Sequence, residues 1–328
     1  MLPARHPVPA RPHVGLGVKL ALAAASIVLT AAAAETITRV WGSALPVFLI
    51  PSPTNCMRRS ALLGVDFRPE CTGVMNGAPF RTNALGLRGP EVVDDDRMRI
   101  LAAGDSCTFG WAVRESQAYP ARLERVLDQH AGTHRFQVIN AGVPGYTSYQ
   151  GLVYLRERGL ALQPKLVLID YGFNDTSRTG DIQQQLARAP LTTPFLVLDD
   201  TLIDYSRFYR WLRWQAGAKE DDGTLPARVS AEQYGRNLRA MIQAARAAGA
   251  NVVVLSFWSR IGPQQNDYRE ALNAATEDTD TPVVWYRGPK LDLVHPTIEG
   301  YGIFTDSIAA QLMESGFVQP AGSAQNAT

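Results

Sequence analysis

Short apolar runs separated by amphipathic stretches constrain the fold of this chain more than any other feature. In Leu166–Asp170 the first four residues are all apolar, which is typical of a strand in a parallel sheet covered on both faces. Similar runs predict further strands, and the stretches between them carry leucine and valine at helical spacing. The predicted strands are 100–103, 136–139, 166–170, 252–257 and 283–286, and the predicted helices are 119–130, 148–158, 231–248 and 298–313.

This alternation predicts an α/β fold, a three-layer αβα sandwich with a mostly parallel sheet. The 328 residues are 46% hydrophobic, enough to bury a substantial core. The net charge is +1 and no basic run is interleaved with aromatic residues, so we expect no nucleic-acid partner. No cluster of histidine, cysteine or carboxylate residues has metal-ligand spacing, so we expect neither a metal nor another cofactor.

The N-terminus begins with two segments of different character. Residues 1–13 contain two arginines, four prolines and no acid, which predicts a disordered basic tail. Residues 14–34 are apolar, but only fifteen uncharged residues follow Lys19, a length between a signal-peptide core and a spanning helix of about 20 residues. We favour an uncleaved transmembrane anchor, in which Lys19 snorkels to extend the helix. Cleavage after Ala32-Ala33-Ala34 and a buried soluble helix are the alternatives.

The arginines that precede this segment predict a cytoplasmic N-terminus, with the rest of the chain anchored on the exported side or, after cleavage, secreted. Residues 35–96 are rich in proline, glycine and arginine and predict an N-terminal arm that packs on the domain. In this arm Cys56 and Cys71 would close a loop of about fifteen residues if they form a disulfide. Unpaired, they would be small buried hydrophobic residues, as we expect of Cys107.

Polar residues with catalytic potential follow several predicted strands. Ser106 comes directly after the strand that ends near Gly104, and ligands of parallel sheets bind outside the carboxyl ends of strands. A serine nucleophile needs a base and a group that orients the base. Near the C-terminus, Asp292 lies three residues before His295, and this pair supplies both the base and the orienting group. The four other histidines lie in the N-terminal tail or a predicted surface loop, so elimination also favours His295.

Four blocks together resemble the SGNH/GDSL hydrolase family over roughly residues 97–312. They are Gly104-Asp105-Ser106, Gly145, Gly172-Phe173-Asn174-Asp175, and Asp292 to His295, in the order of the family. The resemblance implies an SGNH fold of flavodoxin type. It also implies an oxyanion hole formed by the backbone N–H groups of Ser106 and Gly145 and the side-chain amide of Asn174. Gly142 competes with Gly145 for this role, and Asp105 and Asp175 are expected to brace turns.

These observations predict a serine esterase with Ser106 as nucleophile, His295 as base and Asp292 as orienting acid. It would hydrolyse an O-acyl ester of a small molecule, a lipid or a glycan through an acyl-enzyme. One alternative is an O-acyltransferase acting on an exported polysaccharide, with the same chemistry. Another is a non-catalytic carbohydrate-binding or assembly protein with the same fold.

Residues 176–230 interrupt the strand–helix alternation within a hydrolase domain that we place at 97–316. This interval is too long for a simple connection, so it predicts an insertion or lid. Within it, residues 203–214 predict one helix dense in aromatic residues, with arginine at every third position. That helix could border a substrate pocket, lie against anionic lipid, or pack over the sheet. Residues 317–328 predict a flexible tail.

Overall fold

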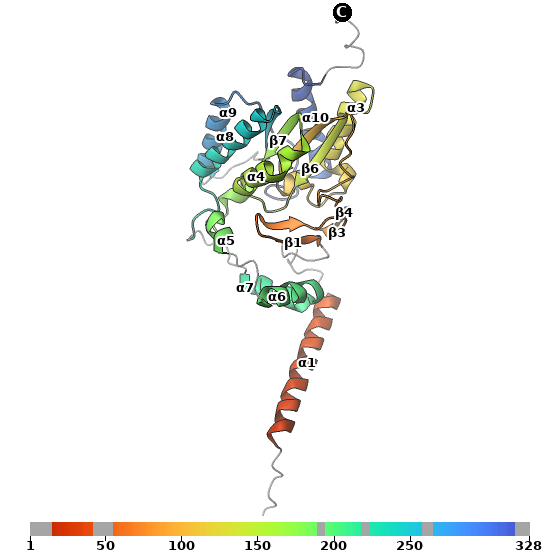
Figure 1. Cartoon of the computed structure of the whole chain (residues 1–328), viewed down its shortest axis with the longest axis vertical. Helices are drawn as coiled ribbons and strands as arrows, with labels where there is room; N and C mark the ends of the chain where they lie inside the picture. The colour runs from red at the N-terminus through yellow and green to blue at the C-terminus, as the bar shows by residue number, and fades with distance from the viewer. Residues whose placement is uncertain (1–14, 42–54, 189–193, 218–223, 258–264, 319–328) are drawn as a thin grey trace, which may run out of the picture.

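A five-stranded parallel sheet forms the centre of the molecule (Figure 1). The computed structural model describes residues 15–41, 55–188, 194–217, 224–257 and 265–318. The strand order is β6-β5-β7-β8-β9, and every pairing within this sheet is parallel. The strands are β5 Met98–Gly104, β6 Phe136–Gly142, β7 Leu166–Asp170, β8 Asn251–Ser256 and β9 Val283–Trp285.

Helices cover both faces of the sheet, which confirms the predicted three-layer α/β fold. Successive strand residues point to opposite faces, so Leu101 and Ala103 pack in one core while Ile100 and Ala102 pack in the other. The first face is covered by α4 Ser148–Tyr154, α8 Ala231–Ala247 and α9 Asn266–Glu277, the second by α3 Tyr119–Ala131 and α10 Ile298–Glu314. Shorter helical segments are α2 Ser106–Phe109, η3 Glu115–Gln117, the π-helix η4 Leu155–Gly159, η5 Leu160–Leu162 and η6 Phe173–Thr176.

The N-terminal arm differs from its prediction in two respects. The first helix, α1 Leu16–Trp41, continues past the expected boundary at residue 34. Residues 57–81 then form two antiparallel hairpins, whose strands are too short for a periodic pattern to be visible in the sequence. Cys56 and Cys71 form a disulfide that links the two hairpins. The hairpin strands are β1 Met57–Ser60, β2 Gly64–Phe67, β3 Thr72–Met75 and β4 Ala78–Arg81.

The arm packs on the segment that follows β5. The ring of Phe67 stacks on that of Phe109, with centroids 5.2 Å apart. The buried Arg88 guanidinium donates hydrogen bonds to the carbonyl oxygens of Phe109, Gly110 and Val113. The arm therefore supports the backbone immediately after residue 106.

The described residues of the long insertion form three helices, and the insertion lies between the domain and α1 (Figure 1). They are α5 Ile182–Arg188, α6 Pro194–Tyr205 and α7 Arg207–Gly217. The single helix expected at 203–214 is therefore wrong, because the chain turns at Ser206, whose hydroxyl accepts a hydrogen bond from the Tyr209 N–H and starts a new helix. Helices α6 and α7 make polar contacts with each other, with α1, with the β1–β2 hairpin and with Arg68, which follows that hairpin.

The C-terminal boundary lies later than predicted. Val318 is buried in the same core as α10, so residues 317 and 318 belong to the domain rather than to a flexible tail. Residues 319–328 and the predicted disordered segment 1–13 lie outside the described residues.

Candidate active site

Ser106 occupies the first position of α2, directly after β5, an inner strand of the sheet. A Cβ atom on Gly104 would lie 2.1 Å from the Thr108 hydroxyl oxygen and 2.9 Å from the Asp170 carbonyl oxygen, so this tight strand end requires glycine. The Asp105 side chain accepts a hydrogen bond from the Cys107 N–H and caps α2. These contacts fix the backbone on both sides of Ser106, which is 8% exposed.

The order of the strands explains why distant segments meet at Ser106. The chain passes from β5 to β6 on one side and then to β7 on the other, so the topological switch point lies between β5 and β7. Ligands of open parallel sheets bind at such points. Ser106 follows β5 and Asn174 follows β7, which places both residues at this crevice.

A hydrogen-bonded chain joins Ser106, His295 and Asp292, three residues predicted from the sequence to act together. The Nε2 atom of His295 lies 2.8 Å from the Ser106 Oγ, and its Nδ1 atom lies 2.7 Å from Asp292 Oδ2. The other Asp292 oxygen accepts hydrogen bonds from the backbone N–H groups of Val294 and His295, at 2.9 and 2.8 Å. Both the carboxylate and the imidazole are therefore held in orientation by the loop that carries them.

This loop is fastened at both ends. The Leu291 N–H donates to the His295 carbonyl oxygen, and the Thr297 N–H donates to that of Pro289. Thr297 also caps α10 by accepting a hydrogen bond from the Gly300 N–H. From the first turn of α10, the Tyr301 hydroxyl donates to the Cys107 carbonyl oxygen at 3.0 Å. The helix after the base is thus tied to the helix that begins with the nucleophile.

Trp111 is a site residue that the sequence did not reveal. Its ring stacks on the His295 imidazole, with centroids 5.0 Å apart and an angle of 17° between the planes. The chain turns at Gly110, whose φ is +92°, and this turn directs Trp111 back over the site. The only sequence signal was its position five residues after Ser106.

The environment of the triad favours a neutral imidazole beside a charged carboxylate. Burial lowers the pKa of His295 below its ordinary value, and the neighbouring Asp292 opposes this shift only in part. Burial raises the pKa of Asp292, but hydrogen bonds from His295 and from the Val294 N–H outweigh it, so the pKa lies below the ordinary value. A neutral imidazole 2.8 Å from the serine hydroxyl is suited to accept its proton.

The three predicted oxyanion donors lie around this edge of the sheet, but they are not equally available. Gly145 has φ +83° in a turn closed by a hydrogen bond from the Tyr146 N–H to the Val143 carbonyl oxygen. Within the described part of the chain, no hydrogen bond is made by the N–H groups of Ser106 and Gly145. The Asn174 amide donates to Asp105 Oδ2 at 2.9 Å and to the Tyr146 carbonyl oxygen at 3.1 Å. Both of its hydrogens are engaged, so it must release one partner to bind an oxyanion.

Gly142, the alternative donor, has a structural function instead. Its N–H donates to Asn140 Oδ1 at 3.0 Å. A Cβ atom at this position would lie 2.2 Å from the backbone nitrogen of Phe109, so only glycine allows β6 and α2 to approach this closely. This leaves Gly145 as the better candidate, and its role as a donor stays a prediction.

The remaining polar groups near Ser106 brace the site. Asp175 accepts hydrogen bonds from the N–H and hydroxyl of Ser148. Burial raises the pKa of Asp105 and of Asp170, which lie near each other beneath the nucleophile turn. Burial also raises the pKa of the Cys107 thiol, which points to the Val294 carbonyl oxygen and not to the imidazole. A thiol is therefore poorly placed to replace the serine.

Known proteins are similar to this chain in the domain that carries the site. The model of the GDSL-like Lipase/Acylhydrolase family matches residues 102–303. Thioesterase 1/protease 1/lysophospholipase L1 of Escherichia coli (strain K12) is 35% identical over 85 residues, which are 26% of this chain and 38% of that protein. Two crystal structures are similar in fold. TesA has 21% identity and a TM-score of 0.46 over 66% of this chain and 99% of its own. The psychrotrophic esterase EstA from Pseudoalteromonas sp. has 16% identity and a TM-score of 0.45, over 68% of this chain and 100% of the EstA chain.

Proposed function

The chain belongs to the GDSL-like lipase/acylhydrolase family, and from this membership we propose that it is a serine esterase that hydrolyses an O-acyl ester. The substrate class is an acylated small molecule, lipid or glycan. Ser106 is the nucleophile, His295 the general base and Asp292 the group that orients the base. The observation that carries this proposal is the continuous hydrogen-bonded chain from the Ser106 Oγ through the imidazole to the Asp292 carboxylate.

The reaction proceeds through an acyl-enzyme in two similar steps. His295 accepts the Ser106 proton as the oxygen attacks the ester carbonyl carbon, and the resulting oxyanion receives hydrogen bonds from the N–H groups of Ser106 and Gly145. The protonated imidazole then gives its proton to the departing alcohol. In the second step the same imidazole takes a proton from water, which attacks the acyl carbon. The bond from that carbon to the Ser106 Oγ then breaks, the imidazolium returns its proton to the Oγ, and the carboxylic acid leaves. Asn174 completes the oxyanion hole after one of its two present hydrogen bonds opens.

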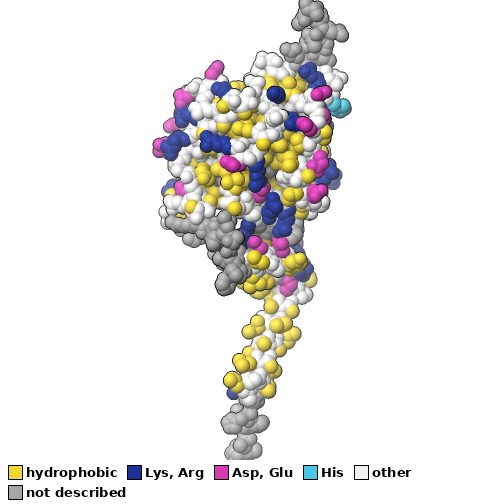
Figure 2. All heavy atoms as spheres, in the orientation of Figure 1, with side chains coloured by type: hydrophobic (Ala, Val, Ile, Leu, Met, Phe, Trp, Pro, Cys, Tyr) yellow, Lys and Arg dark blue, Asp and Glu magenta, His cyan; other side chains and the backbone are white. Residues whose placement is uncertain are grey.

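We further propose that α1 anchors the protein in a membrane, with the catalytic domain on the exported side. Among the described residues, Leu16–Val40 is the one span long and apolar enough to cross a bilayer, and none of it is buried (Figure 2). The Cys56–Cys71 disulfide supports an oxidising compartment for the domain. Glu35 and Arg39, near the end of α1, form hydrogen bonds with the folded insertion, which supports retention of the helix.

The test of the esterase uses the full chain in detergent micelles. Hydrolysis of p-nitrophenyl acetate and labelling by a fluorophosphonate probe are measured for the native chain, Ser106→Ala and the neighbouring Cys107→Ser. We expect Ser106→Ala to lose both activities, Cys107→Ser to retain both, and the probe to be found on the peptide that contains Ser106. Equal hydrolysis by the native chain and Ser106→Ala would refute the proposal and favour a binding protein with this fold.

A further inference from the structure

Helix α6 directs Val197, Leu198 and Tyr205 outward and its acids toward the protein. Val197, Leu198 and Tyr205 have exposed fractions of 69%, 55% and 76%. Leu198 follows Val197 directly, and Thr201 and Tyr205 follow Val197 by four and eight positions, which places these residues on one side of the helix. The Thr201 hydroxyl donates to the Val197 carbonyl oxygen within the same helix. This outward face, defined by Val197, Leu198, Thr201 and Tyr205, carries no charge, which is unusual for a helix exposed to water.

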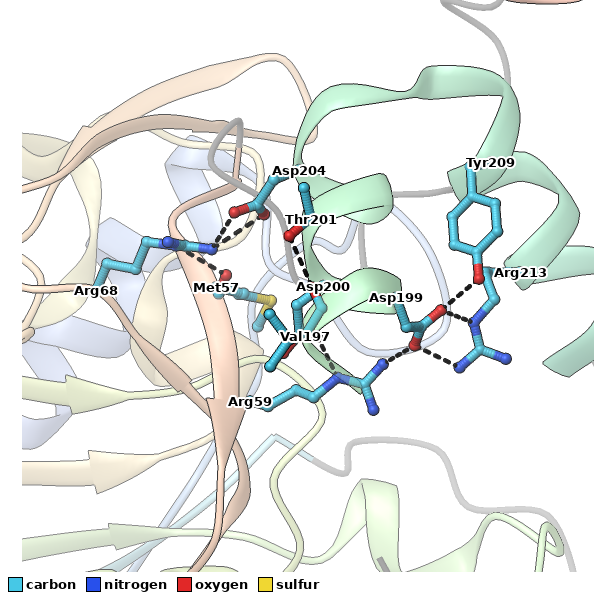
Figure 3. A network of polar contacts seen from close by, with 10 residues as sticks. All are labelled: Met57, Arg59, Arg68, Val197, Asp199, Asp200, Thr201, Asp204, Tyr209 and Arg213. Carbon is cyan, nitrogen blue, oxygen red and sulfur yellow. Dashed lines mark hydrogen bonds and ion pairs between the residues drawn. The ribbon is translucent and has the colours of Figure 1, made fainter. Parts of the chain in front are cut away.

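The opposite side of α6 is held by a network of charged contacts (Figure 3). Arg59 of the β1–β2 hairpin pairs with Asp199 and Asp200, and Arg68 contacts both oxygens of Asp204 at 3.0 and 3.1 Å. Ile203, on the same side, is 3% exposed. All three acids therefore face the folded domain, and the orientation of the outward apolar face is fixed by these contacts.

The insertion is also joined to the end of α1. The Glu35 carboxylate accepts hydrogen bonds from the Ser206 hydroxyl and from the N–H groups of Arg207 and Phe208, so a residue of α1 caps the N-terminus of α7. Arg39 donates to the Tyr205 carbonyl oxygen at 2.8 Å. Figure 1 shows α6 lying across the end of α1, and Figure 2 shows hydrophobic side chains gathered beside that end.

The length of α1 places α6 at the level of a bilayer surface. The apolar part from Leu16 to Ala34 spans ~28 Å at the helical rise, close to the ~30 Å of a hydrocarbon core. Glu35 then lies where the hydrocarbon ends, and α6, fixed to that turn, lies at the boundary between headgroups and acyl chains. Apolar residues and tyrosine are the side chains that favour this boundary.

We propose that α6 rests on the surface of the bilayer that α1 crosses, with Val197, Leu198 and Tyr205 inserted among the lipids. This inference depends on the proposed retention of α1 as an anchor. The insertion begins at η6, which carries Asn174, and the segment that returns from it to α8 is fixed by the hydrogen bond from Arg228 to the Gly145 carbonyl oxygen. With α6 on the lipid surface, the insertion would connect the bilayer to the edge of the active site and fix the distance of that site from the bilayer.

The experiment uses the full chain reconstituted in vesicles of phosphatidylcholine and phosphatidylglycerol. The variants Val197→Cys, Leu198→Cys and Tyr205→Cys are each labelled with an environment-sensitive fluorophore. Labelling is specific because the native Cys107 is buried and the other two native cysteines form a disulfide. Labels at Leu29 on α1 and Ile303 on α10 are the references, with exposed fractions of 70% and 41%. Quenching is measured with lipids that carry a spin label near the headgroup end of the acyl chain.

We expect quenching at Leu29 and at two or more α6 positions, with about a twofold loss of emission for a label at the interface and no loss at Ile303. Quenching at Leu29 together with none at the α6 positions would overturn the inference while the anchor stands. Blue-shifted α6 labels that lipid does not quench would also overturn it, because a second copy or another protein would then cover this face. Absence of quenching at Leu29 would refute the anchor itself. Three α6 positions are used so that one poorly folding variant does not decide the result.

Discussion

The indole of Trp111 lies flat against the imidazole of His295, with centroids 5.0 Å apart and planes inclined by 17°. The imidazole is thus restrained on three sides, by Asp292 at one nitrogen, Ser106 at the other and an aromatic face. Because the indole also excludes water from one face of the ring, it contributes to the burial that lowers the pKa of His295.

Trp111→Leu is expected to reduce kcat/KM by about 3- to 10-fold, the loss that corresponds to ~0.5–1.5 kcal/mol for an aromatic pair. Exposure of the imidazole to water should also raise the pKa of His295 toward its ordinary value. The acid limb of the pH profile should therefore move to higher pH. Trp111→Phe keeps a stacked ring and is the matched control, with a profile close to that of the native chain. Identical profiles for native chain and Trp111→Leu would contradict this role.

The native pH profile of kcat/KM should rise to a plateau with a midpoint below about 6.5, the ordinary histidine value. The base must be neutral, and a lowered pKa keeps it neutral to lower pH. Asp292 raises the pKa of His295, so its replacement in Asp292→Asn should move the midpoint further down while the plateau falls. A midpoint above 7 in the native chain would be inconsistent with the buried environment of His295.

Removing the orienting acid should reduce catalytic activity less than removing the base. Asp292→Ala is expected to retain roughly 100-fold more activity than His295→Ala, the difference found where an orienting acid and a base act in one triad. Two backbone N–H groups hold Asp292 in the loop, whereas His295 is the one residue in the described part of the chain that is hydrogen-bonded to the Ser106 Oγ. Single-turnover acylation with a chromogenic ester measures both variants, and equal losses would contradict the assignment.

Asn174→Ala is expected to lower kcat by ~10²–10³-fold with little change in KM, as for loss of one oxyanion donor. The same amide also holds Asp105 and the Tyr146 carbonyl oxygen, so unfolding in urea is needed to separate catalysis from stability. Gly142→Ala provides the contrast, because its methyl group meets the Phe109 backbone and should impair folding rather than kcat. Unchanged kcat in a folded Asn174→Ala protein would remove Asn174 from the oxyanion hole.

Replacing both Cys56 and Cys71 with serine should lower the free energy of unfolding by about 3 kcal/mol, the chain-entropy value for a fifteen-residue loop. Urea titration of the native chain with and without reductant provides the comparison. Reductant should lower the urea midpoint of the native chain and leave that of the double serine variant unchanged. If the reductant opens the disulfide and the urea midpoint of the native chain does not change, the disulfide does not stabilise the hairpins.

The sequence predicted the sheet well because its strands are buried on both faces. Residues 166–170 were predicted with the observed bounds, and 252–257 differs from β8 by one residue at each end. Helix α9 was not predicted, because Leu272 is the one large aliphatic side chain among its four buried residues, which are Tyr268, Leu272, Ala275 and Thr276. The four-residue strands of the arm gave no period at all.

The sequence predicted which residues form the candidate site more completely than it predicted how they are arranged. Spacing within one loop linked Asp292 to His295, and the family resemblance linked them to Ser106. No pattern could reveal that the Asn174 amide is engaged by Asp105, or that Trp111 covers the imidazole, because both depend on how separate loops meet. The outward apolar face of α6 was hidden for a related reason, since its acids look like a solvated surface until their arginine partners are known.

The 189 positions between Ser106 and His295 determine when a newly made chain acquires its chemistry. Synthesis runs from the N-terminus, so the nucleophile turn emerges long before the loop that bears its base. For an exported chain, the ribosome and the translocation channel hold this polypeptide while its serine hydroxyl has no proton acceptor. In the proposed mechanism, hydrolysis begins only after the loop that carries Asp292 and His295 has folded beside Ser106. We therefore expect any fragment that ends before Lys290 to be inert as an esterase.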